Sequence, residues 1–215
     1  MHITEDVAIL GLFPTPVFIV NCKDVDLTSA IQVFDDCVLN ERESNEYGAR
    51  SVDTYILNRP ECSMLKSWVE TKVLDYARNV LGYDISNVAI TQSWVSVKCQ
   101  GQKHTAHVHP NSIISGVFYW NDIEKQPIVF SKPNVHELAQ VIKLPMVDNV
   151  DNPFASNGFY YHPRKNDLVL FPSFLKHSVG VVNKGCRKSL AFNIMPRGKF
   201  GDQDSLYELD FSLLT

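Results

Sequence analysis

The chain has 215 residues and a formal net charge of −4 at pH 7, with 45% hydrophobic and 20% charged residues. This length fits one domain with a substantial core, and the composition is typical of a folded globular protein. The acidic balance argues against a nucleic-acid-binding protein, because such domains usually present a basic surface. No apolar run approaches the roughly 20 residues of a membrane-spanning helix, so we expect no membrane association.

The five cysteines are odd in number and form no C-x-x-C pair; they are Cys22, Cys37, Cys62, Cys99 and Cys186. This pattern favours reduced thiols over a disulfide scaffold or a cysteine-based zinc site. The first residues lack the basic start and apolar core of a signal peptide. We therefore predict a cytoplasmic protein.

Two helices are predicted in the first part of the chain. Apolar residues recur at helical spacing over residues 26–41, where Asp26 or Thr28 is placed to cap the start. A second apolar face covers residues 65–81, followed by Gly82 where a helix often ends in a glycine. Both faces are best explained as core packing.

Most of the remaining chain is predicted to form short strands, because apolar and β-branched residues alternate between turn residues. The expected strands are residues 12–20 (an edge strand or extended lead-in, given its two prolines), 88–97, 113–120, 127–131, 167–171, 178–182 and 189–195. Strands without intervening helices indicate a mainly β fold with the helices on one face, an antiparallel barrel or jelly roll.

We expect a single domain over residues 1–215. Residues 1–86 would supply the N-terminal strand and supporting helices, and residues 87–200 the β core. Residues 134–166 are long and irregular, with three prolines, which favours a substrate loop or lid over a linker.

The histidines carry the main chemical signal. His107 and His109 would project from one face if they lie on a strand, since side chains alternate there. His177, which follows a predicted strand and turn, is the natural third metal ligand, and His104 is an alternative to His109. Three imidazoles suit zinc, iron, copper or nickel, and three protein ligands leave positions open on an iron(II) for substrate and O2.

Arg187 and Ser189 are two residues apart, so they share one face of a predicted strand. An arginine offers a bidentate cation, and the serine a hydroxyl, to a carboxylate. Together with the histidines, the pair indicates a metal enzyme with an acidic small-molecule co-substrate.

The order of these motifs is informative. H-x-H is followed by SGVFYWN at 115–121, LFPSFLKHSV at 170–179 and RKSLAFN at 187–193. With the lead-in at 12–17 and the strand at 93–95, this order resembles the 2-oxoglutarate/Fe(II) oxygenases related to prolyl hydroxylases. The resemblance covers most of the chain, and the combination of motifs is more specific than any one of them.

The resemblance implies a double-stranded β-helix, a cupin-like barrel that holds Fe(II), with 2-oxoglutarate as co-substrate. His107 and His177 match the two family histidines. Arg187, Ser189 and Tyr119 match the groups that bind the distal carboxylate of 2-oxoglutarate, although a core tyrosine is an equal alternative for Tyr119. His109 stands where the wider superfamily has Asp or Glu, so the third position is filled by His109, by His104 or by water.

The implied activity is that of a dioxygenase, a hydroxylase that decarboxylates 2-oxoglutarate to succinate and uses O2 to oxidise a peptide or metabolite of unknown identity. The alternatives are a cupin-type metalloenzyme that does not use 2-oxoglutarate and a catalytically silent metal-binding barrel. A homodimer through the helices or the N-terminal strand is one assembly that the sequence allows. Aromatic residues that line the pocket or fill the core are Trp94, Trp120, Phe154, Phe159, Tyr160 and Tyr161.

Overall fold

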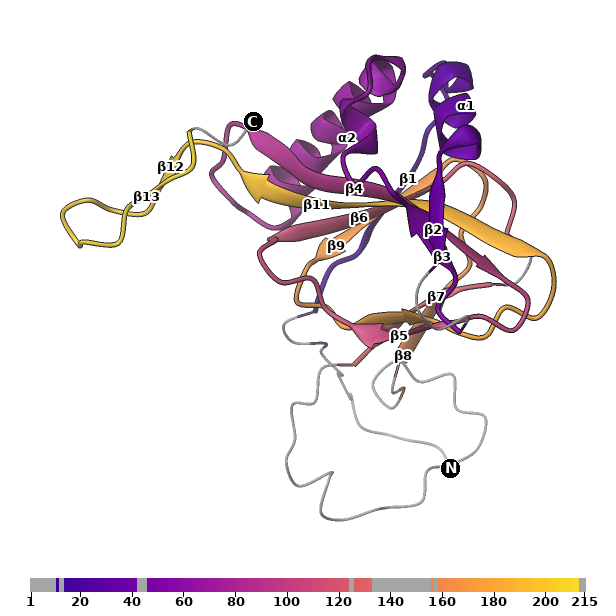
Figure 1. The fold of residues 1–215 in the computed structure, drawn as a ribbon. Helices are drawn as coiled ribbons and strands as arrows, with labels where there is room; N and C mark the ends of the chain where they lie inside the picture. The colour runs from indigo at the N-terminus through magenta and orange to yellow at the C-terminus, as the bar shows by residue number, and fades with distance from the viewer. Residues whose placement is uncertain are drawn as a thin grey trace, which may run out of the picture.

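Two β-sheets face each other, and helices cover the outer face of the larger sheet (Figure 1). The structure, a computed structural model, describes residues 11, 14–41, 46–123, 126–132, 156 and 158–212. The predicted mainly β architecture with helices on one face is therefore confirmed. No helix among the described residues is long and apolar enough to cross a membrane.

The strands pair antiparallel throughout both main sheets. The seven-stranded sheet has the order β1 (Phe18–Asn21), β9 (Asp167–Pro172), β6 (Ile114–Tyr119), β11 (Cys186–Pro196), β4 (Val88–Cys99), β3 (Ala49–Ser51) and β2 (Leu39–Glu41). The four-stranded sheet has the order β5 (His104–His107), β10 (His177–Val179), β7 (Ile128–Ser131) and β8 (Gly158–Tyr161). The short strands β12 (Lys199–Phe200) and β13 (Leu209–Asp210) pair with each other.

The helix layer contains α1 (Thr28–Asp36), α2 (Ser63–Asp75), the π-helical turn η3 (Tyr76–Val80) and the 3-10 turns η1 (Ile56–Asn58) and η2 (Pro60–Cys62). The N-cap of α1 is Leu27, without a side-chain cap, so the predicted capping by Asp26 or Thr28 is wrong; the Asp26 carboxylate accepts a 2.9 Å hydrogen bond from the backbone N–H of Thr28, the first residue of the helix. Gly82 ends the second helical segment at a φ of +73°. The first helix ends at Asp36 rather than at residue 41, because residues 39–41 pair with β3 instead.

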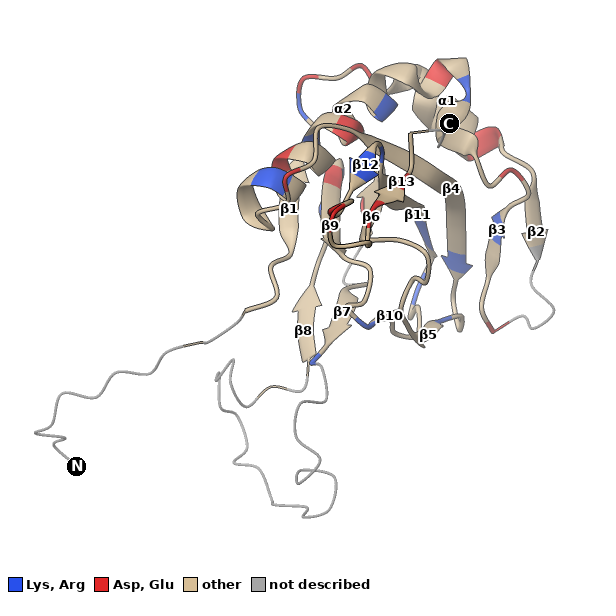
Figure 2. Ribbon diagram, turned by 90° about the vertical axis from the view of Figure 1, so that its left-hand side faces the viewer, with Lys and Arg blue, Asp and Glu red and all other residues tan. Residues whose placement is uncertain are grey.

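Charged residues tie the helix layer to the large sheet. Helix α1 ends in two acidic residues, whereas α2 carries both signs (Figure 2). Asp35 of α1 forms a 2.7 Å ion pair with Lys188 on β11. This contact shows that Lys188 lies on the helix side of β11, so that Arg187 and Ser189, on either side of it, face the smaller sheet.

Alternation along the strands creates two separate cores. One lies between the helices and the large sheet and contains, among others, Phe34, Leu65, Phe118 and Leu190. The other lies between the two sheets and is built from Val117, Tyr119, Ile123, Ile128, Phe130, Val169, Phe171 and Leu175. The inter-sheet core occupies only part of the space between the sheets, and the polar residues described below occupy another part.

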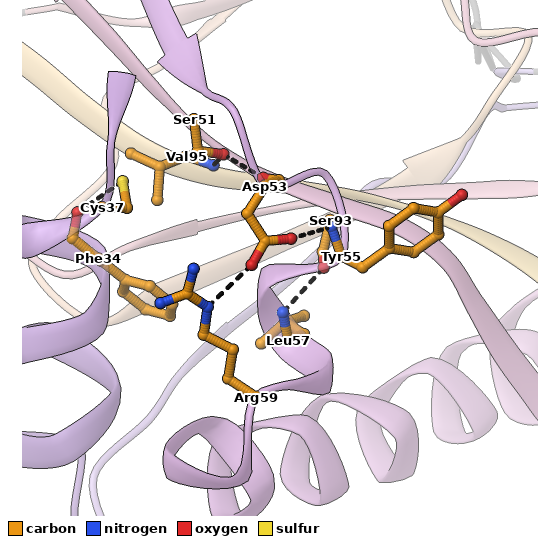
Figure 3. A network of polar contacts seen from close by, with 9 residues as sticks. All are labelled: Phe34, Cys37, Ser51, Asp53, Tyr55, Leu57, Arg59, Ser93 and Val95. Carbon is orange, nitrogen blue, oxygen red and sulfur yellow. Dashed lines mark hydrogen bonds and ion pairs between the residues drawn. The ribbon is translucent and has the colours of Figure 1, made fainter. Parts of the chain in front are cut away.

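A polar network fixes the segment between β3 and η2 against β4 (Figure 3). The buried Ser51 hydroxyl accepts a hydrogen bond from the backbone N–H of Val95, and the buried Ser93 hydroxyl accepts one from Leu57. Asp53 accepts 2.8 Å hydrogen bonds from the backbone of Tyr55 and from Nε of Arg59. These contacts hold β4 on its helix side. The opposite face of β4 is directed toward the candidate site described below.

One expectation about the cysteines is wrong. Cys99 and Cys186 lie directly opposite each other on β4 and β11 and form a disulfide, while Cys22, Cys37 and Cys62 remain thiols. The two cysteines are 87 residues apart in the chain, and only the register of the two strands brings them together. Spacing along the sequence carries no sign of such a pair.

The predicted irregular segment 134–166 is described only in part. Residue 156 and residues 158–166 are described, and residues 158–161 form β8, which pairs with β7. This portion is therefore a strand rather than an irregular loop. The expectation of a substrate loop over residues 134–155 and at residue 157 lies outside the described residues.

Candidate metal and co-substrate site

Three histidines come together on β5, at the start of β10 and on the segment that follows β5. His107 ends β5, His177 begins β10, and these two residues are directly paired across the strands. His109 lies two residues beyond β5. One ligand nitrogen from each of His107, His109 and His177 lies within 4.8 Å of the others, and the Nε2 atoms of His107 and His109 are 3.2 Å apart. The structure thus brings together the three histidines predicted from the sequence.

The position of His109 differs in detail from the prediction. We expected His107 and His109 on one strand face, but β5 ends at His107. The backbone N–H of His109 instead donates a 3.0 Å hydrogen bond to the carbonyl of Ser173, in the turn before β10. The turn, rather than strand alternation, places His109 next to His177.

All three imidazoles are engaged through Nδ1. Nδ1 of His107 lies 2.8 Å from the carbonyl oxygen of Thr105, and Nδ1 of His177 lies 3.0 Å from that of Leu175. Nδ1 of His109 lies 2.5 Å from Oδ1 of Asn193. These oxygens can only accept, so each Nδ1 carries the proton and each Nε2 keeps its lone pair for a metal.

Burial favours the neutral, metal-binding form of His177 and His109. It lowers the pKa of His177 to about 3, and it also lowers the pKa of His109, where the hydrogen bond to Asn193 acts in the opposite direction. A neutral imidazole is the form that binds a metal ion. His177 and His109 therefore offer uncharged nitrogen ligands.

His104, the alternative third ligand, is near but not part of this group. Its ring centre lies 4.2 Å from that of His107, on the same short strand. The ligand nitrogens that converge belong to His107, His109 and His177. The geometry therefore favours His109 over His104.

Arg187, Ser189 and Tyr119 also lie together. Nη2 of Arg187 donates a 2.7 Å hydrogen bond to the Tyr119 hydroxyl, and Nη1 donates a 3.2 Å hydrogen bond to Oγ of Ser189. Arg187 is only 3% exposed, its Nε has no hydrogen-bond partner, and no carboxylate among the described residues forms an ion pair with it. Arg187 is close enough to His177 to help lower the pKa of that imidazole.

Tyr119 is a core tyrosine that also contacts Arg187. It belongs to the inter-sheet core and is fully buried, and burial raises the pKa of its hydroxyl. The same hydroxyl accepts the hydrogen bond from Arg187. It is a core tyrosine whose polar end orients the buried cation.

Sequence reasoning missed a second polar pair beside this one. Lys98 lies directly opposite Arg187, and Ser96 directly opposite Ser189, on β4. Lys98 is 3% exposed and its Nζ donates a 2.6 Å hydrogen bond to Oγ of Ser96. The Ser-x-Lys spacing on β4 mirrors the Arg-x-Ser spacing, and it is the signal that would have found the pair.

The aromatic residues weighed as pocket lining divide between several roles. The Trp94 ring stacks on His109 with centres 6.0 Å apart, whereas Trp120 is buried against Phe34 in the helix-side core. The Tyr161 hydroxyl donates to the buried carboxylate of Asp167. Phe159 and Tyr160 on β8 are largely exposed, and Phe154 lies outside the described residues.

Solved structures with the same fold include a 2OG-Fe(II) oxygenase-family protein and a prolyl-4-hydroxylase. HygX from Streptomyces hygroscopicus, with nickel and 2-oxoglutarate bound, is 12% identical, with a TM-score of 0.57 and coverage of 85% of this chain and 83% of that one. A Pseudomonas putida prolyl-4-hydroxylase is 13% identical, with a TM-score of 0.56 and coverage of 86% and 94%. A 2OG-Fe(II) oxygenase-family oxidoreductase from Burkholderia pseudomallei is 11% identical, with a TM-score of 0.57 and coverage of 83% of each chain. These similarities confirm the double-stranded β-helix.

Sequence comparison points to the same group of enzymes. No curated protein sequence matches this chain. The family model described as "Putative 2OG-Fe(II) oxygenase" matches residues 92–193, a segment that includes the three histidines, Arg187, Ser189 and Tyr119. Residues 92–193, just under half of the chain, therefore resemble the 2OG-Fe(II) oxygenase family.

Proposed function

We propose that this protein is an Fe(II)- and 2-oxoglutarate-dependent hydroxylase. His107, His109 and His177 would bind the metal ion, and Arg187 with Ser189 and Tyr119 would bind the distal carboxylate of 2-oxoglutarate. The family supports the two cofactors, and the arrangement of the side chains supports the individual roles.

The histidines fit a divalent iron. Three nitrogen lone pairs converge, each ring is held through Nδ1, and no described carboxylate belongs to the group. Neutral imidazoles bind iron(II) well, and three protein ligands leave open positions for the co-substrate and O2. The ligand set by itself does not separate iron from zinc or nickel, and the choice of iron rests on the family.

The observation that carries the proposal is that the buried Arg187 has no carboxylate partner among the residues that the structure describes. A buried charge is costly unless it is paired, and this guanidinium has one described hydroxyl on each Nη and nothing on Nε. The distal carboxylate of 2-oxoglutarate would provide the missing negative charge and accept the Nε hydrogen. A cupin that does not use 2-oxoglutarate has no need of such a group.

Bound iron and 2-oxoglutarate would supply the oxidation: 2-oxoglutarate and O2 give succinate and CO2, and the second oxygen atom becomes a hydroxyl on the prime substrate. The chain's own residues would orient the keto acid and limit the access of water. The prime substrate would be either a peptide or a small metabolite. HygX has been solved with hygromycin B, and a Trichoplax adhaerens prolyl hydroxylase with a peptide fragment of hypoxia inducible factor.

The direct test is an anaerobic titration of metal-free protein with Fe(II) and then with 2-oxoglutarate, monitored by visible absorption. A weak charge-transfer band that needs both additions, followed by succinate formation on exposure to O2, supports the proposal. Metal binding without a band indicates a cupin or a silent barrel. Absence of metal binding overturns the assigned histidine site.

The third ligand can be tested separately. His109→Asp would restore the carboxylate of the wider superfamily and should keep or raise the affinity for Fe(II), whereas His109→Ala should lower it. Equal affinity of His109→Ala and wild type would remove His109 from the ligand set. The same measurement on His104→Ala, expected to match wild type, serves as the control.

We also propose a cytoplasmic location, as the sequence predicts, and there the Cys99–Cys186 pair would meet reducing thiols. Trapping thiols in acid-quenched cells measures its oxidation state, and a fully oxidised pair would indicate an oxidising compartment and overturn the location.

A homodimer is likewise a proposal, which sedimentation at several concentrations tests.

A further inference from the structure

His109 is held differently from the other two histidines. His107 and His177 each direct Nδ1 at the carbonyl oxygen two residues earlier in their own chain segment. His109 instead directs Nδ1 at the side chain of Asn193, 84 residues away on β11, at 2.5 Å. The side chain of Asn193 therefore holds the Nδ1 edge of the ring at the carboxylate position of the superfamily.

We propose that Asn193 is the positioning residue that makes His109 a metal ligand, by fixing the tautomer and the direction of its ring. The inference rests on the proposed metal site. It assigns a role to Asn193, the last residue of the RKSLAFN motif, which would not itself contact the metal.

The chemistry of the amide decides which tautomer forms. When Oδ1 faces the imidazole, Nδ1 must carry the proton and Nε2 is free to bind a metal. If the amide were reversed, Nδ2 would donate to Nδ1 and the ring proton would move to Nε2, between the ring and the metal. An acceptor at residue 193 is therefore needed, and a donor would block the site.

The backbone around Asn193 fixes where its side chain points. Asn193 lies on the central strand β11, directly opposite Gln92 on β4 and Ser115 on β6. The pairing of β11 with β4 shifts register immediately after Asn193, and such irregularities often redirect a side chain beside a functional site. The Thr91 hydroxyl also donates a 3.3 Å hydrogen bond to the Asn193 carbonyl oxygen.

The other side of His109 is anchored as well. Its backbone N–H bonds to Ser173, whose buried hydroxyl joins those of Ser112 and Ser115 at 2.8 Å each. Ser112 in turn accepts a 3.2 Å hydrogen bond from the backbone N–H of Ile194, next to Asn193. Hydrogen bonds through Ser173 and Ser112 therefore link the backbone of His109 to that of Ile194, the residue after Asn193.

Two substitutions distinguish the effect of losing the hydrogen-bond acceptor from the effect of changing the volume of the side chain. Asn193→Leu keeps the approximate volume and removes the acceptor, and because Asn193 is only partly buried, the variant should fold. Asn193→Asp keeps an acceptor of the same shape. We expect Leu to weaken metal binding on the order of 10- to 100-fold, the usual effect of losing such a hydrogen bond, and Asp to bind at least as tightly as wild type.

The experiment is an anaerobic titration of the metal-free full chain with Co(II), which reports both affinity and ligand field through its visible d–d absorption. The matched control is Thr91→Val, which removes the contact to the Asn193 backbone but leaves the side chain, and which should bind Co(II) as wild type does. Thermal unfolding of each metal-free variant checks the fold. If Asn193→Leu does not fold, Asn193→Ala, which also removes the acceptor, is read in its place, with the same expectation of weaker binding.

The outcomes distinguish this inference from the ligand assignment. Weak binding by Asn193→Leu, restored by Asp, with little further loss when Leu is combined with His109→Ala, supports the positioning role. Wild-type affinity and spectrum in Asn193→Leu, with weak binding by His109→Ala, overturns the role of Asn193 and leaves the metal site intact. Wild-type binding by His109→Ala overturns the assignment of His109, and this inference with it.

Discussion

The guanidinium of Arg187 is fixed by Tyr119 in two ways: Nη2 donates a 2.7 Å hydrogen bond to the Tyr119 hydroxyl, and the guanidinium carbon lies 5.0 Å from the centre of the same ring. A buried, already oriented cation loses little freedom when an anion binds to it. If Arg187 binds 2-oxoglutarate as proposed, its guanidinium is therefore already oriented before the co-substrate binds.

Replacing Arg187 with Leu should weaken 2-oxoglutarate binding by about 2 to 4 kcal/mol, on the order of 30- to 1,000-fold, because the distal carboxylate would be left buried without its cation. Isothermal titration of the metal-loaded protein under anaerobic conditions measures the change, and Co(II) affinity should stay near that of wild type. Lys188→Ala is the matched control, since the neighbouring Lys188 contacts Asp35 on the helix side of the sheet. Unchanged 2-oxoglutarate affinity in Arg187→Leu would reject this role.

Stability of the metal-free protein should decrease as the pH falls below about 6.5. Burial lowers the pKa of His177 to about 3, so between these values the unfolded chain binds a proton that the folded chain does not. The loss from this group is at most about 1.4 kcal/mol per pH unit. Urea unfolding with a chelator at about pH 7 and about pH 5 measures it. His177→Asn should show a smaller dependence on pH, and an equal dependence would contradict this cause.

Gly116 on β6 should not tolerate a larger residue. A Cβ at this position would overlap the Phe192 ring and approach Leu170 on the helix side of the sheet. We expect Gly116→Ala to lower the free energy of unfolding by about 1 to 3 kcal/mol, the usual cost of overpacking a core. Gly180→Ala, where nothing lies within 4 Å, is the control and should change little. Recovery of stability in Gly116→Ala/Phe192→Leu would confirm the overlap, and a stable single variant would contradict it.

The Cys99–Cys186 disulfide should stabilise the fold by about 2 to 4 kcal/mol, since it closes a long loop and so restricts the unfolded chain. Urea unfolding of wild type with and without reductant, and of Cys99→Ser/Cys186→Ser, measures this contribution. Reductant should leave the double variant unaffected, because the other cysteines are thiols already. A wild type insensitive to reductant would show that the disulfide adds nothing to stability.

Much of the fold could be predicted from the sequence because its strands follow simple alternation. Residues 88–97 and 189–195 are rich in alternating and β-branched or apolar residues, and they form β4 and β11, the longest strands of the sheet. Strands β2 and β3 were not predicted, since each has three residues and includes polar ones such as Asn40 and Arg50. These two strands form because they pair with each other and with β4, and their own residues carry no strand pattern.

The site was predictable where residue spacing along one segment decides the geometry, as for Arg187 and Ser189. It was not predictable where distant segments meet. The contact of His109 with Asn193 and the pairing of Cys99 with Cys186 depend on the register of β11 against its neighbours, which single-segment patterns do not encode. Even His109 reached the predicted place by a turn rather than by the expected strand.

The disulfide also changes how the chain is connected as a molecule. Residues 99–186 become a covalent ring, and the three histidines of the candidate metal site all lie inside it, while Arg187 and Asn193 lie just beyond it. A peptide bond cleaved once between residues 99 and 186 would therefore not release a fragment. Oxidised protein nicked in this ring would keep its apparent mass until a reductant separates the two pieces.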